Sequence, residues 1–179
     1  MRRFQEDEPL SVDDLTAFVN VARFAPCGNN LQLLRFHIAE TEAEKKAIFA
    51  RLHWAALLKD WDGPAVGERP QGYIAICAPT KMADNAIRLI DTGIAAQTMS
   101  LAATTRGVRC CMLRSFDKDV DEIMGTAEQG YSSELILAFG VAAEKVVLED
   151  VDDEHGVAYW RDAESVHHVP KRSLEDVLI

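Results

Sequence analysis

The chain has 179 residues, a formal net charge of −10 and a sequence pI near 4.9. This length suffices for one domain with a buried core, so we expect one domain over residues 1–179. The acidic balance opposes binding to nucleic acid or to an anionic membrane surface, because both carry negative charge. No apolar run approaches the ~20 residues of a membrane span, and the first residues lack a signal-peptide core, which predicts a cytoplasmic protein.

Four cysteines, Cys27, Cys77, Cys110 and Cys111, lack the spacing of metal ligands. In a cytoplasmic protein this pattern predicts free thiols and no metal site. Cys110 and Cys111 are neighbours in a strand-like run, so their side chains should point to opposite faces. A disulfide between them would require unusual local geometry.

Helices and strands alternate along the predicted chain. Capping signals and apolar residues at helical spacing predict helices, and short apolar runs bounded by Gly or Pro predict strands. The predicted helices cover about residues 11–23, 41–58, 84–106 and 117–124, and the predicted strands cover 34–39, 73–78, 108–113 and 135–140. The composition of residues 59–71 predicts a solvent-facing loop, and the chain from 144 onward is expected to be irregular. This order favours an α/β or α+β sandwich.

Residues 25–32, Ala-Pro-Cys-Gly-Asn-Asn-Leu-Gln, follow the first predicted helix. Pro26 stops the helix, and Gly28 permits backbone angles that other residues avoid. Two Asn and one Gln supply amide donors and acceptors, which suit the edge of a planar polar ring. The same composition is also typical of an ordinary connecting loop.

Several segments resemble, in the same order, the FMN-dependent nitroreductase family. The matching segments are 2–4 for its basic N-terminal element, 25–32 for its flavin loop, 91–97 for its central helix, 108–117 for the strand passing the flavin, and 169–176 for its basic C-terminal arm. Residues 57–61 and 159–162 are similar to a small-nitroreductase subgroup. The resemblance implies an α+β nitroreductase-like fold with a mainly antiparallel sheet flanked by helices. It also implies an intertwined homodimer with an exchanged C-terminal segment.

The resemblance further implies FMN as the cofactor, with NADH or NADPH as co-substrate. The implied cofactor-binding residues are Arg2, Arg3, Pro26, Cys27, Gly28, Asn30, Gln32, Met112, Leu113, Arg114, Ser115, Lys171 and Arg172. The four cations at the chain's two ends would hold the phosphate. The N–H of Ser115 would approach the flavin N5, and Arg114 would favour the reduced, anionic flavin. His167 and His168 are expected to be surface histidines.

The implied activity is a ping-pong reduction of nitroaromatics, quinones or similar small electron-poor acceptors. The flavin carries the chemistry, so no side chain is assigned as catalytic. Trp54 and Trp61 could stack on the substrate or could simply pack. Alternatives are a flavin-binding or sensing protein with little turnover, and a different flavin reaction on the same fold.

Three departures from the family pattern bear on these expectations. The Arg-Ser portion that would precede Arg2 is missing, Cys27 stands in place of Ser, and Leu33 stands in place of Pro. A thiol is a poorer hydrogen-bonding group than a hydroxyl. The missing Arg-Ser portion predicts weaker FMN binding, or a replacement cation at the phosphate.

Overall fold

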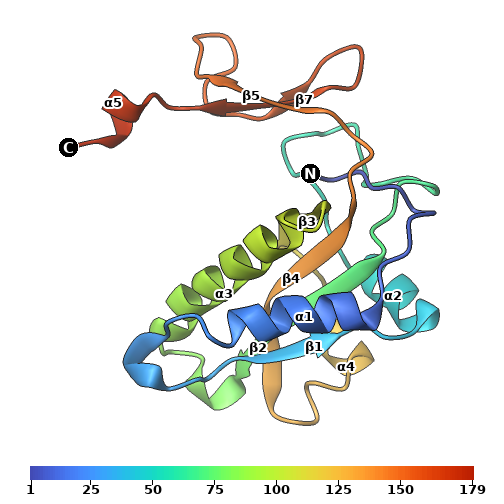
Figure 1. Ribbon diagram of the computed structural model, residues 1–179, viewed down its shortest axis with the longest axis vertical. Helices are drawn as coiled ribbons and strands as arrows, with labels where there is room; N and C mark the ends of the chain where they lie inside the picture. The colour runs from blue at the N-terminus through green and yellow to red at the C-terminus, as the bar shows by residue number, and fades with distance from the viewer.

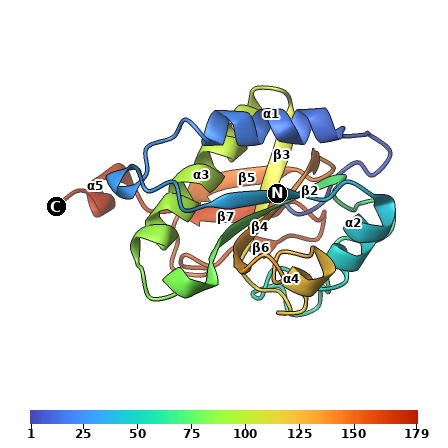
Figure 2. The same cartoon turned by 90° about the horizontal axis from the view of Figure 1, so that it is seen from below.

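The computed structural model describes residues 1–179 and contains two sheets (Figure 1). The main sheet has the order β1-β2-β4-β3, and every neighbouring pair is antiparallel. Its strands are β1 (Arg35–Ile38), β2 (Gly72–Pro79), β3 (Val108–Leu113) and β4 (Tyr131–Val141). One face carries α1 (Val12–Ala22) and α3 (Ile87–Thr104), and the other carries α2 (Glu42–Phe49) and α4 (Val120–Ile123) (Figure 2). The predicted α+β class with a mainly antiparallel sheet is therefore confirmed.

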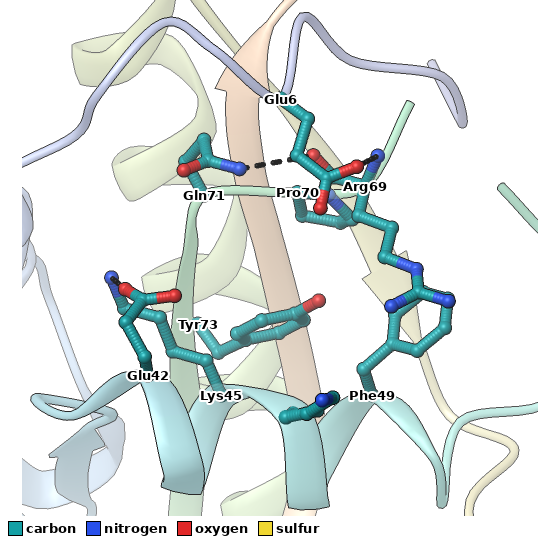
Figure 3. A pocket seen from close by; sticks show the side chains of 9 residues that line it. Glu6, Glu42, Lys45, Phe49, Arg69, Pro70, Gln71 and Tyr73 are labelled. Carbon is teal, nitrogen blue, oxygen red and sulfur yellow. Dashed lines mark hydrogen bonds and ion pairs between the residues drawn. The ribbon is translucent and has the colours of Figure 1, made fainter. Parts of the chain in front are cut away.

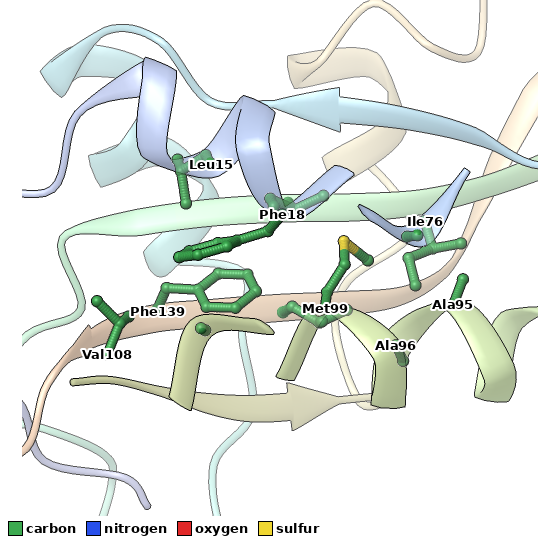
Figure 4. Packing of buried hydrophobic residues seen from close by; sticks show 12 residues of the cluster. Leu15, Phe18, Ile76, Ala95, Ala96, Met99, Val108 and Phe139 are labelled. Carbon is green, nitrogen blue, oxygen red and sulfur yellow. The ribbon is translucent and has the colours of Figure 1, made fainter. Parts of the chain in front are cut away.

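Strand β2 is apolar along its whole length because helices cover both faces of the sheet. On the α1 and α3 side, Phe18 packs on Phe139 with ring centroids 5.4 Å apart. Met99 of α3 and Ile76 of β2 belong to the same buried cluster (Figure 4). Ala96 is fully buried, so its small side chain lets α3 lie close to the sheet.

The second helix is shorter than its sequence pattern predicts. It ends at Phe49, so the prediction of a helix continuing to Leu58 is wrong. Leu52 instead forms an isolated β-bridge with Phe116, and Ala55 has a left-handed φ of +40°. Pairing with the segment after β3 overrides the local helical spacing. The other predicted helices and strands of this body are present with ends shifted by a few residues.

A second sheet forms where irregular chain was predicted, so that prediction is also wrong. Its strands are β5 (Val146–Asp150), β6 (Trp160–Arg161) and β7 (His167–Lys171), in the order β5-β7-β6. Strands β5 and β7 are parallel, and β6 and β7 are antiparallel. A last helix, α5 (Leu174–Val177), follows on an arm that extends away from the main body (Figure 1). None of the helices combines the length and apolar composition needed to cross a bilayer.

Glu144 joins the second sheet to the N-terminus. Its side chain is 1% exposed and accepts hydrogen bonds from Arg161 Nη2 at 2.9 Å and from the main-chain N–H of Arg3 at 3.3 Å. The N–H of Arg2 also donates to Glu144. The Arg161 guanidinium lies 4.3 Å from the ring centroid of Trp61. This buried charge cluster fixes the basic N-terminal residues against the second sheet.

Candidate functional site

Most of the predicted site residues line two separate hollows. The loop hollow, about 310 Å³, lies beneath residues 25–36 between α1 and α3. Its lining includes Pro26, Cys27 and Gln32. The strand-end hollow, about 370 Å³, lies at the end of β3. Its lining includes Arg2, Trp54, Tyr159 and the run Met112, Leu113, Arg114, Ser115.

The loop above the first hollow is held in an uncommon conformation. Asn29, Asn30 and Gln32 have φ values of +51°, +53° and +48°, all in the left-handed region. Asn tolerates this region, whereas Gln adopts it rarely. Such strain persists only where the surrounding structure fixes the backbone, and it is enriched at functional sites. The Asn and Gln side chains are exposed, so their amides are available to a ligand.

Helix α3 fixes this loop through Gly28. The Gly28 N–H donates to Asp91 Oδ1 at 2.9 Å, and a Cβ at position 28 would overlap Ile87 Cγ2. Asp91 is 3% exposed, and its second carboxylate oxygen has no hydrogen-bond partner. Asp91 was not predicted as a site residue, although it begins the segment that resembles the family's central helix. It acts here as the anchor of the loop.

The strand-end hollow contains a main-chain N–H without a hydrogen-bond partner, that of Ser115, next to the cation of Arg114. Leu113 points into the core and is 5% exposed, whereas Met112, Arg114 and Ser115 are exposed. Arg114 forms no ion pair, and the Ser115 N–H donates no hydrogen bond within the chain. The Ser115 carbonyl accepts from the His53 N–H at 3.0 Å, which fixes this segment.

The two N-terminal arginines point to different places. Arg2 lines the strand-end hollow, where Nη1 donates to His167 Nε2 at 2.5 Å and the guanidinium lies 4.2 Å from the Tyr159 ring centroid. Arg3 lies outside this hollow, with Nε 3.3 Å from Glu68 Oε2. The structure therefore brings Arg2, but not Arg3, to the end of β3.

His167 is buried rather than at the surface, so that expectation was wrong. It is 1% exposed. Burial, and then the Arg2 guanidinium, lower the pKa of His167 to about 4. The imidazole is thus neutral near pH 7 and can accept the Arg2 hydrogen bond. Its Nδ1 is buried without a partner.

Lys171 and Arg172 lie at the end of β7, on the C-terminal arm, where both are exposed and form no ion pair. Figure 1 shows this arm at the opposite end of the molecule from the bend at Gly28–Asn30. The predicted site residues therefore occupy three places in one chain: the loop, the strand-end hollow and the arm.

The two tryptophans have packing partners. Trp54 is 8% exposed, with its ring centroid 6.0 Å from that of Phe49 and 6.5 Å from that of Trp61. Trp61 is half-buried beneath Arg161. Packing accounts for both side chains, and stacking on a substrate stays a prediction.

The family model for the nitroreductase family matches residues 1–141, so the chain belongs to the nitroreductase family. No match was found among curated protein sequences.

Solved structures share the fold at low sequence identity. A nitroreductase family protein from Clostridium novyi NT is 18% identical with a TM-score of 0.63, over 100% of this chain and 93% of that chain. A presumed NAD(P)H:FMN oxidoreductase from Staphylococcus epidermidis is 15% identical with a TM-score of 0.68, over 99% and 89% of the two chains. A presumed nitroreductase from Exiguobacterium sibiricum, in complex with FMN, is 17% identical with a TM-score of 0.65, over 80% and 84%.

Proposed function

We propose that this protein binds FMN and uses NADH or NADPH to reduce nitroaromatic, quinone or similar electron-poor acceptors by a ping-pong mechanism. Membership of the nitroreductase family supports the reaction class. The observation that carries the assignment in this chain is the unpaired Ser115 N–H beside Arg114, in a hollow that Arg2 also lines. Bound FMN would supply the hydride chemistry, accepting hydride from the nicotinamide and passing reducing equivalents to the acceptor.

The donor groups present fit the parts of FMN. The exposed amides of Asn30 and Gln32 suit the polar edge of the isoalloxazine. The Ser115 N–H is available as a donor to the ring, where a fixed main-chain donor stabilises developing negative charge. Lys171 and Arg172 are free cations that suit the phosphate.

We propose that two copies assemble the site. In one chain the loop and the C-terminal arm lie apart (Figure 1), so a single copy cannot bring both to one ligand. The arm ends in exposed apolar side chains, namely Leu174, Val177, Leu178 and Ile179. Exposed apolar side chains of this kind are expected to pack against another protein surface. Exchange of arms between two copies would provide that surface.

The visible absorption spectrum of the purified protein, recorded with and without added FMN and after desalting, tests flavin binding. We expect a bound flavin spectrum, and oxidation of NADH or NADPH when a quinone or nitroaromatic is supplied. Protein that stays colourless after incubation with FMN would rule out the proposal.

One observation favours a second candidate, a flavin-binding protein with little turnover. Arg2 is engaged by His167, and Arg3 is turned toward Glu68, so two of the predicted phosphate cations already have partners. If FMN binds but neither nicotinamide is oxidised with any acceptor, this second function holds instead.

A further inference from the structure

A third cavity lies on the α2 side of the sheet and shares no lining residue with the loop hollow or the strand-end hollow. Its volume is about 310 Å³. Residues of α2, of the segment before β2 and of the N-terminal segment enclose it (Figure 3). We call it the α2 cavity. Neither the proposed flavin chemistry nor the family resemblance uses it.

Arg69 gives this cavity an uncompensated cation. Its guanidinium lies 4.6 Å from the ring centroid of Phe49, across the cavity from the main chain that carries it (Figure 3). Its Nε is buried without a hydrogen-bond partner, and no carboxylate forms an ion pair with it. In a chain with net charge −10, a half-buried Arg without a carboxylate partner is a candidate for binding an anion from solution.

Tyr73 supplies a second unused donor. The residue is 2% exposed and lines the cavity, and its hydroxyl forms no hydrogen bond within the chain. Burial raises the pKa of Tyr73 well above its usual range, so the phenol keeps its proton. The hydroxyl is not among the fully buried atoms that lack a partner, so it opens to the cavity and is free to donate to an acceptor on a ligand.

The remaining charges leave the cavity with an excess of one cation. Lys45 is paired with Glu42 at 2.8 Å, while Lys46 has no ion pair. Glu6 also lines the cavity, but its Oε2 accepts from the main-chain N–H groups of Gly67 and of Arg69. Together with Arg69, these side chains contribute three positive and two negative charges.

We propose that the α2 cavity binds a small organic carboxylate. Its carboxylate group would pair with Arg69 and Lys46, because a guanidinium fork matches carboxylate geometry. Its apolar body would lie against Phe49, and a polar group at its other end would accept from the Tyr73 hydroxyl. The site is independent of the flavin, so it does not depend on the proposed activity.

Isothermal titration calorimetry of the full chain with 4-hydroxybenzoate tests the proposal, before and after incubation with FMN. We expect one binding site per chain in both states. Arg69→Met should weaken binding about tenfold or more, because it removes a charge-assisted hydrogen bond. Tyr73→Phe should weaken binding several-fold, and benzoate, which lacks the second polar group, should bind more weakly to the unmodified protein.

Two matched controls separate this site from others. Lys118→Met removes an exposed cation elsewhere, and Arg114→Met alters the strand-end hollow; both should leave 4-hydroxybenzoate affinity unchanged. Inorganic phosphate should bind more weakly than the carboxylate. The proposal would be overturned if no heat of binding appeared at millimolar 4-hydroxybenzoate, or if phosphate bound more tightly than the carboxylate. It would also be overturned if Tyr73→Phe and Arg69→Met left binding intact, or if Arg114→Met abolished it.

Discussion

Asp91 explains how the loop at Gly28 keeps its shape. One carboxylate oxygen accepts the Gly28 N–H, and the other is buried without a partner. Burying a carboxylate with an unpaired oxygen is unfavourable, so this arrangement is not one that stability alone would select. Together with the left-handed residues that follow, it supports the proposal that the loop binds a ligand.

Gly28→Ala should weaken FMN binding about tenfold or more. The new Cβ would overlap Ile87 Cγ2, and overpacking of this kind costs about 1–3 kcal/mol, which would displace the loop. Titration of FMN fluorescence against the variant measures the change. Adding Ile87→Ala removes the overlapping atom and should recover part of the affinity. An unchanged dissociation constant in the single variant would contradict the role of this close approach.

Pro26 could be identified from the sequence because its effect is local. The expectation that Gly28 adopts backbone angles that other residues avoid was wrong, because its φ is not positive and glycine is needed there for the close approach of Ile87. The Gly28–Asp91 hydrogen bond spans 63 positions, and the Arg2–His167 hydrogen bond spans 165. No local pattern encodes contacts of that separation. The sequence therefore predicted the loop and its polar side chains but missed the anchor that positions it.

Strand β7 places two adjacent histidines in opposite electrostatic environments. The Nδ1 of His168 lies 2.7 Å from Glu149 Oε2, and its Nε2 lies 3.1 Å from Asp162 Oδ2. These hydrogen bonds to carboxylates raise the pKa of His168. His167 faces the opposite way, where burial, and then its contact with Arg2, lower its pKa.

The stability of the second sheet should be greatest near pH 6.5. The pKa of His168 is raised in the folded state, so this residue stabilises the fold fully below its ordinary pKa of 6.5. That contribution to the free energy of unfolding is lost as pH rises through the folded-state pKa. His167 has a folded pKa of about 4, so its contribution is complete above 6.5 and is lost as pH falls toward 4. Urea unfolding midpoints between pH 4 and 9 measure the decline in stability on each side of pH 6.5.

Two variants test which histidine causes each decline in stability. His168→Gln should flatten the decline above pH 6.5, and His167→Gln should flatten the decline below it. A profile that neither substitution alters would show that other groups set the pH dependence.

Helix α3 has an exposed apolar face that its own chain does not cover. Ile90 and Leu101 are 63% and 58% exposed, and Gly93 lies between them with open space around it. Exposed aliphatic side chains beside a small residue are suited to close contact with a second helix.

If the proposed dimer forms through this face, Ile90→Lys should shift the protein to monomer, because a charge would be buried at an apolar interface. Size-exclusion chromatography with light scattering measures the change. Val66→Lys is the control, since Val66 is 79% exposed on the excursion between α2 and β2. A dimer that persists in Ile90→Lys, or dissociates equally in Val66→Lys, would argue against this face.

The errors in element assignment have a common physical cause. Strands β5 and β7 pair in parallel across 21 positions, from Val146 to His167, and neither shows apolar alternation. Helix α2 ends early because Leu52 pairs with Phe116. In both places a non-local main-chain pairing decides the structure, while the sequence signals used for prediction are local.

In a single chain, the loop and the arm that we propose to bind one flavin are far apart. The amide loop and the cationic arm lie at opposite ends of one chain, so the proposed site would combine the loop of one copy with the arm of another. A two-fold dimer creates two equivalent sites in this way. Mixed dimers of two different variants distinguish a site shared between copies from a site formed within one chain.

A loop-defective variant, Asn30→Ala with Gln32→Ala, and an arm-defective variant, Lys171→Ala with Arg172→Ala, should each bind FMN weakly as pure proteins. After unfolding and refolding together, random mixing should recover tight FMN binding at about a quarter of the sites. Half of the dimers are then mixed, and in each mixed dimer one site carries both defects while the other carries none. FMN titration of the mixture, compared with each variant refolded alone, measures the recovered fraction. If loop and arm of the same chain formed each site, every site in the mixture would keep a defect and no tight binding would return.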